Sequence, residues 1–151
     1  QFTMRTGSRT FEAAAFLRRS GADTGDVKKL FQNDLEGTIA KYDIIQTARM
    51  YKSGIAVAKV DHTVGRITAA QAADELLNIS GIDTSFVLFP DQEGRVILSA
   101  RSMGDVNVQV VLEKLGGGGN AATAGAQVPN KTVDEVAGML FQAIDQYLAD
   151  E

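Results

Sequence analysis

The sequence predicts an α/β fold, in which a small mixed sheet is flanked by helices and preceded by a short all-helical segment. Up to about residue 50, apolar residues recur every three to five positions, which is typical of helices packed on one side. After residue 54, short runs of β-branched residues alternate with helical patterns, and this alternation favours an α/β domain of about a hundred residues.

The first segment is expected to hold three helices. Ser8 can cap the first, which Ser20 and Gly21 would end. A short helix follows from Asp23 or Thr24 to Phe31, and a longer one starts after Asn33 or Asp34 and ends before Gly54. Three helices with different apolar faces cannot bury themselves alone, so we expect this segment to pack on something else, with a homodimer as one outcome.

The second segment is expected to form four strands and three helices. The strands are predicted over 55–60, 85–89, 95–100 and 126–128. A near capping box at Thr68–Gln71 would open a helix to Ile79, and Asp105 would cap a helix over 106–115. The capping box Thr132–Glu135 would open the last helix, whose apolar stripe runs from Val136 to Leu148.

Composition excludes several function classes. The chain has no Cys, which rules out disulfides, Cys-ligated zinc and a thiol nucleophile. No run approaches the ~18 apolar residues that cross a membrane, so a cytoplasmic location is expected.

The charge of the chain is uneven. Residues 61–151 carry five Lys and Arg against thirteen Asp and Glu, which disfavours general binding of long nucleic acids but allows binding of a short ligand. Because the chain begins with Gln1 rather than Met, we expect a piece of a longer protein.

The most distinctive motif is the glycine run Gly116, Gly117, Gly118 and Gly119, followed by Asn120. Such a run can direct several backbone N–H groups at one anion, and Asn120 can cap one helical turn over Ala121–Ala124. A flexible linker or a plain helix C-cap explains the composition equally well.

Arg101 and Ser102 follow a predicted strand, where Arg101 could donate two hydrogen bonds to a phosphate. The alternative is a surface Arg paired with Asp105. The single histidine, His62, is expected to be exposed or locally hydrogen-bonded. No cluster with metal-ligand spacing and no nucleophile–base pair is evident, so the chain alone should be inactive.

Four motifs together resemble the DHH-associated domain of GdpP-type cyclic-di-AMP phosphodiesterases, whose parent proteins are expected to carry a membrane anchor upstream. They are Ser99–Ser102, Asp105–Gln109, Leu115–Asn120 and Ala124–Gln127. The opening residues 2–11 resemble the end of the DHH catalytic domain. The resemblance implies a helical tail of that domain and linker over 1–53 and a substrate-binding domain over 54–151.

The resemblance also implies a function. The parent would hydrolyse cyclic-di-AMP with two manganese ions held by its upstream DHH domain, whereas this fragment would hold no cofactor. The fragment would bind a cyclic dinucleotide or short oligonucleotide through Arg101, Ser102, the glycines 116–119 and Asn120. Alternatives are an oligonucleotide or single-strand nuclease of the same superfamily and a non-catalytic nucleic-acid-binding module. The family usually has His where this chain has Asn120, which removes proton transfer but keeps hydrogen bonding.

Overall fold

The computed structural model describes residues 24–150, with side chains from Asp34 onward. These residues belong to two compact units that divide between Ala40 and Lys41. In this described range, no helix combines the length and apolar character needed to cross a membrane.

Residues 24–46 of the first segment form one helix, α2 (Thr24–Gln46). The expected break at Asn33 or Asp34 is therefore wrong, because the capping preference of these residues does not interrupt a helix that neighbouring helix formers continue. Leu35 and Ile39, one turn apart on this helix, are 58% and 52% exposed. The helix expected after Ser8 lies outside the described residues, and the homodimer stays a prediction.

The second unit is built on a six-stranded mixed sheet in the order β1-β2-β3-β4-β6-β5. Its strands are β1 (Ala48–Lys52), β2 (Ile55–Lys59), β3 (Thr84–Pro90), β4 (Arg95–Ser102), β5 (Gly118–Gly119) and β6 (Thr123–Pro129). Only β2 and β3 run parallel, and all other neighbours are antiparallel. The predicted α/β class with a small mixed sheet is confirmed.

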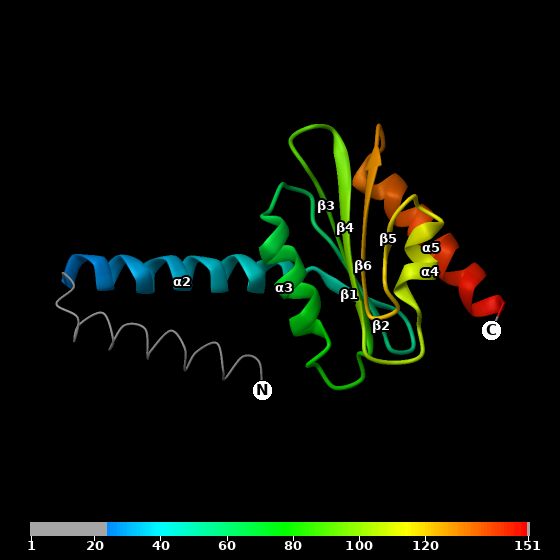
Figure 1. Ribbon diagram of the computed structural model, residues 1–151, viewed down its shortest axis with the longest axis horizontal. Coiled ribbons are helices and arrows are strands. Elements are labelled where there is room, and N and C mark those ends of the chain that lie inside the picture. The colour runs from blue at the N-terminus through cyan, green and yellow to red at the C-terminus, as the bar shows by residue number, and fades with distance from the viewer. Residues whose placement is uncertain (1–23, 151) are drawn as a thin grey trace. The chain divides into compact units, whose positions relative to one another are not determined.

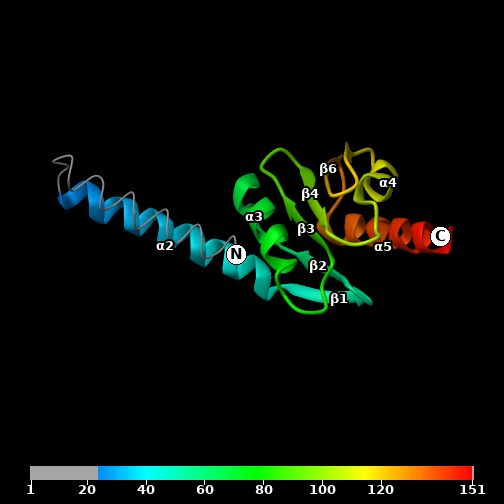
Figure 2. The same cartoon turned by 60° about the horizontal axis from the view of Figure 1, so that its bottom comes forward.

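Helices cover the two faces of the sheet unequally. Helix α3 (Arg66–Leu76) connects the parallel strands and lies on one face, whereas α4 (Val108–Glu113) and α5 (Val133–Ala149) lie on the other (Figures 1 and 2). The larger core lies under α4 and α5 and contains Phe86, Leu98 and Leu140. The smaller core lies under α3 and contains Val87, Phe89 and Ile97.

Two predicted helix starts are wrong and one is confirmed. Helix α3 starts at Arg66, because the carbonyl of Gly65 already accepts from the N–H of Ala69, so the Thr68 box lies inside the helix. Helix α4 is capped by Asn107 rather than Asp105, whose carbonyl accepts instead from the Tyr147 hydroxyl. The capping box at Thr132 and Glu135 forms as predicted.

Two strands replace predicted helical structure. Residues 48–52, expected at the end of a helix, form β1 and pair with β2 across a turn in which Gly54 has a φ of 83°. The helical turn expected over Ala121–Ala124 is also wrong, because β5 and β6 form an antiparallel hairpin there. In both places a strand partner outweighs a local preference for helix.

Candidate functional site

The side of the sheet that carries α3 is only partly covered. Helix α3 contacts β3 and β4, and β6 and β5 lie beyond it along the sheet. Along β6 the residues alternate, so that Ala124, Ala126 and Val128 are buried while Thr123, Gly125, Gln127 and Pro129 are exposed. The strand pairing places these exposed positions beside Arg101, Ser99, Ile97 and Arg95 of β4. The α3 side of β6 is therefore an open surface of polar and glycine positions.

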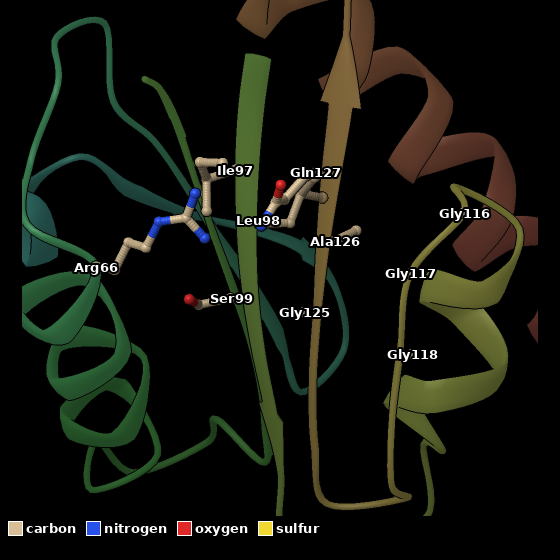
Figure 3. A pocket seen from close by; sticks show the side chains of 10 residues that line it. All are labelled: Arg66, Ile97, Leu98, Ser99, Gly116, Gly117, Gly118, Gly125, Ala126 and Gln127. Carbon is tan, nitrogen blue, oxygen red and sulfur yellow. The ribbon is translucent and has the colours of Figure 1, made fainter. Parts of the chain in front are cut away.

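An open pocket of about 550 Å³ lies on this surface. Arg66 from the first turn of α3 stands on one side, and the glycine segment Gly116–Gly118 stands on the other. Figure 3 shows the Arg66 side chain extending from α3 toward Ile97, with the Ser99 hydroxyl directed to the same side of β4. Gly125 and Gln127 of β6 complete the floor. The fold thus brings together residues that are 61 positions apart in the chain.

Three side chains that line this pocket can donate hydrogen bonds to a ligand. Within the described part of the chain, Arg66 makes no hydrogen bond or ion pair, which leaves its guanidinium free to bind a ligand. Gln127 accepts a hydrogen bond from Arg95 at 3.0 Å through its side-chain oxygen, so its NH₂ group remains to donate. The Ser99 hydroxyl can also donate, and no Asp or Glu lines the pocket. Such a donor set suits an anion.

The glycines of this region serve different purposes. A Cβ atom at Gly117 would lie 2.3 Å from the carbonyl oxygen of Gly125, and one at Gly119 would lie 2.3 Å from that of Thr123. These two glycines therefore let β5 approach β6. Gly118 has nothing within 4 Å of an added Cβ atom. Packing does not require glycine at position 118. The absence of a side chain there leaves the backbone at this wall of the pocket exposed.

The backbone N–H groups of the glycine run are partly used inside the protein. Gly116 donates to the carbonyl of Glu113, and Gly117 donates to that of Leu112 at 2.8 Å. The N–H of Gly117 is therefore not available to a ligand. This differs from the expectation that several N–H groups of the glycine run point at one anion. Asn120 accepts from the N–H groups of Ala122 and Thr123, both at 2.9 Å, and so holds the β5–β6 turn.

Arg101 lies outside the pocket and is fixed by other contacts. Its Nε donates to a carboxylate oxygen of Asp74 on α3 at 3.0 Å, and its Nη1 donates to the carbonyl of Ala100. The expected alternative partner, Asp105, is therefore not the one observed. In register, Arg101 pairs with Thr123 and Gly119 pairs with Ala124, so one strand separates Arg101 from the glycine run. Two strand spacings amount to roughly 9.5 Å.

Ser102 points to the opposite face from Arg101. It is 7% exposed, and its hydroxyl oxygen accepts from the N–H of Gly104 and lies 3.5 Å from the hydroxyl of Thr84. In this arrangement the hydroxyl of Ser102 connects the start of β3 to the loop that follows β4, and it does not line the pocket.

His62 is confirmed as an exposed, locally hydrogen-bonded residue. Its Nδ1 lies 3.0 Å from a carboxylate oxygen of Asp61, and this hydrogen bond lowers the pKa of Asp61 below its ordinary value. Among the residues that the structure describes, no three His, Cys, Asp or Glu side chains are grouped so as to hold a metal ion.

Sequence reasoning identified the glycine run but missed Arg66 as a site residue. A signal for Arg66 was present, since a cation in the first turn of a helix is disfavoured by the helix dipole. Its place opposite Ser99 and Gly118 depends on the sheet order, which spacing along the chain does not reveal.

Comparison with known proteins identifies relatives over nearly the whole chain. The model of the DHHA1 domain matches residues 52–150. The chain is 46% identical over 148 residues to the cyclic-di-AMP phosphodiesterase GdpP of Geobacillus thermodenitrificans, a match that covers 97% of this chain and 22% of that protein. It is 41% identical to the cyclic-di-AMP phosphodiesterase PdeA of Listeria monocytogenes, covering 99% of this chain and 23% of the relative. The chain thus spans less than a quarter of the length of these relatives.

Solved structures share the fold at low sequence identity. An exopolyphosphatase-related protein from Bacteroides fragilis superposes with a TM-score of 0.67 at 20% identity, covering 89% of this chain and 43% of that one. A pGpG-specific phosphodiesterase, PggH from Vibrio cholerae, gives a TM-score of 0.58 at 21% identity, covering 83% and 44%. At these identities the similarity is one of fold.

Proposed function

The chain belongs to the DHHA1 domain family, and on that premise we propose that it is the substrate-binding part of a metal-dependent phosphodiesterase that hydrolyses cyclic-di-AMP. The observation that carries this proposal is the pocket beside the glycine run, which offers hydrogen-bond donors and no carboxylate. Phosphate oxygens accept hydrogen bonds and carry negative charge, so they fit such a lining. The names of the two relatives with 46% and 41% identity support cyclic-di-AMP as the ligand.

In this proposal the domain binds and orients the nucleotide, and the hydrolytic chemistry comes from elsewhere in the parent protein. The described residues do not fit a metal site, since no suitable group of three ligands occurs among them. We infer that manganese is held by a DHH domain of the same parent chain, where a metal pair would activate water. This chain's part is to place a phosphodiester next to that domain.

Beyond the pocket, at the end of β4, Arg101 is proposed to meet a second part of the ligand, a phosphate. Its side chain is 17% exposed and held by Asp74, so the guanidinium is already oriented before a ligand arrives. Nε and one N–H of Nη1 are engaged by protein oxygens, and the remaining N–H groups are able to donate. Asn120 supports the same region by holding the β5–β6 turn.

Titration of the chain with cyclic-di-AMP, followed through backbone amide resonances, tests this function. The expected result is movement of the signals of Gly118 and Gly125 in the pocket, while Gly138 on α5 serves as an internal control for the opposite face. Arg101→Ala should weaken binding by about 1.5–3 kcal/mol, the range for a hydrogen bond to a charged group. Thermal stability should change little.

The same titration can overturn the proposal. If cyclic-di-AMP moves no pocket resonance while a long single-stranded RNA does, the domain is a nucleic-acid-binding module. If Arg101→Ala leaves the affinity for cyclic-di-AMP unchanged, Arg101 is only a structural partner of Asp74.

A further inference from the structure

We propose that a second open pocket, between the end of α2, strands β1 and β2, and α5, binds a zwitterionic α-amino acid with a large apolar side chain. In this site Asp43 would hold the ammonium group and Arg49 the carboxylate. The pocket includes Phe141 of α5, so it lies on the opposite side of the sheet from the pocket beside α3. The inference is therefore independent of the proposed function.

The apolar part of this second pocket is an aromatic and aliphatic wall. The pocket has a volume of about 610 Å³, within the range of small-molecule sites in proteins, and all its lining residues belong to the second unit. Met50, Tyr51, Val57 and Phe141 form the wall. The rings of Tyr51 and Phe141 stack with their centroids 4.3 Å apart and their planes at 13°. Such a wall suits an aromatic or large aliphatic side chain of a ligand.

The wall depends on a bulge in β1. The register with β2 shifts between Met50 and Lys52, which makes Tyr51 an extra residue in the strand. A bulge changes the direction of the side chains around it. The Tyr51 hydroxyl donates to Asp145 of α5 at 2.8 Å, and Lys52 lies 3.7 Å from the same carboxylate. Two successive residues of β1 thus reach α5, whereas in a regular strand they would point to opposite faces.

Two charges of opposite sign line this pocket without being paired. Among the side chains of residues 34–150, that of Asp43 makes no hydrogen bond or ion pair. Arg49 donates through Nη1 to the carbonyls of Gln46 and Ala48, at 3.1 and 2.8 Å, but it pairs with no carboxylate in the same range. Its other N–H groups remain to donate. An α-amino acid carries an ammonium and a carboxylate on one carbon, so it can satisfy both charges.

The place of each charge in the fold supports this orientation. Asp43 lies in the last turn of α2, which contains no basic residue, and the negative end of a helix dipole disfavours a carboxylate. An ammonium group there would be attracted by both the carboxylate and the helix end. The Arg49 guanidinium can donate two parallel hydrogen bonds to a carboxylate. Lys59, which also lines the pocket, adds a positive charge that it shares with Asp134 at 2.6 Å.

Calorimetric titration with L-phenylalanine and two analogues tests the site. Phenethylamine lacks the carboxylate and 3-phenylpropionate lacks the ammonium group, so each keeps the ring and one charge. The wild-type chain should bind L-phenylalanine at least about tenfold more tightly than either analogue, which corresponds to about 1.4 kcal/mol. In a parallel titration, the backbone amide signals of Thr47 and Val57 should move, while that of Gly118 beside the other pocket should not.

Each charge has a substitution that should act on one analogue only. Asp43→Asn should weaken binding of L-phenylalanine and phenethylamine at least about fivefold and should not weaken that of 3-phenylpropionate. Arg49→Gln should weaken binding of L-phenylalanine and 3-phenylpropionate to a similar extent and spare phenethylamine. A purely structural role of either residue would instead change the affinity for all three ligands alike.

Two matched variants control for general loss of charge. Asp150→Asn and Lys114→Gln remove the same charges at exposed positions outside the pocket, and they should leave all three affinities unchanged. Thermal unfolding controls for folding. Asp43→Asn should leave the melting temperature unchanged or raise it slightly, because it removes a carboxylate from the negative end of α2.

Three results would overturn the amino-acid site. One is that L-phenylalanine at millimolar concentration moves neither the Thr47 nor the Val57 signal. Another is that both analogues bind as tightly as L-phenylalanine, since the two charges would then not be recognised together. The third is that Asp43→Asn and Arg49→Gln leave the affinity for L-phenylalanine unchanged.

Discussion

The two faces of the sheet use the same strands in opposite ways. On the side covered by α4 and α5, the inward residues Leu98, Ala124 and Ala126 are nearly inaccessible and belong to the same apolar core as Leu140. On the other side, their strand neighbours Ser99, Gly125 and Gln127 remain at the surface of an open pocket. One face maximises apolar burial, and the other keeps donors and bare backbone accessible. Stability and binding should therefore respond to different substitutions.

The largest expected effect is on the stability of the covered face. Leu140→Ala removes a fully buried side chain and should lower the free energy of unfolding by about 2–5 kcal/mol, through lost apolar burial and a cavity. Ile67 on α3, next to the pocket, is 75% exposed, and Ile67→Ala should stay within about 0.5 kcal/mol. Urea denaturation of both variants measures the contrast. Equal losses would show that the α3 side is as important to the core as the α5 side.

The sequence predicted those elements whose pattern is local in the chain, and it missed those that depend on a distant strand partner. Strands β3 and β4 were predictable because each is a local run of β-branched and apolar residues joined by a turn at Pro90–Gly94. The last helix was predictable because its capping box and apolar stripe are local as well. Strand β1 was missed because its residues continue a helical spacing, and only pairing with β2 makes them a strand.

The candidate site was harder to predict for the same reason. Strand β5 consists of two glycines, which have little preference for strands, and it exists because β6 pairs with it. The glycine run was recognisable as a feature, but its partner residues were not. Arg66 and Ser99 lie on different elements, and only the sheet order brings them to Gly118.

Substitutions at two neighbouring glycines should have effects of intermediate size, and they test whether stability and binding depend on different faces of the sheet. Gly117→Ala places a methyl group 2.6 Å from the Cβ atom of Ala126 on the covered side, and this overpacking should cost about 1–3 kcal/mol of stability. Gly118→Ala meets no atom within 4 Å and should leave stability unchanged or raise it by up to about 1 kcal/mol.

For ligand affinity the order of the two glycine variants should be reversed, so that Gly118→Ala is the more damaging substitution. The methyl group of Gly118→Ala would lie on this wall of the pocket and hold a nucleotide off the backbone, so affinity for cyclic-di-AMP should fall by at least about fivefold. Thermal unfolding and amide-resolved titration on the same samples measure both properties. If Gly118→Ala binds like the wild type, the exposed backbone at this wall is not part of the ligand site.

The smallest expected effect concerns the cap that starts α5 on the covered side. Thr132 accepts from the N–H of Glu135, and Glu135 accepts from the N–H of Thr132. Thr132→Ala should cost about 1 kcal/mol of stability.

The hydrogen bond from the Thr132 N–H lowers the pKa of Glu135. The Glu135 carboxylate therefore stabilises the fold above its unfolded pKa of about 4.3, and this contribution is lost as pH falls through the lower pKa of the folded state. Glu135→Gln should therefore reduce the acid sensitivity of unfolding. Neither change should alter cyclic-di-AMP affinity at neutral pH, because the cap lies away from the pocket on the α3 side. A shift in affinity with either variant would show that the two faces are coupled through the sheet.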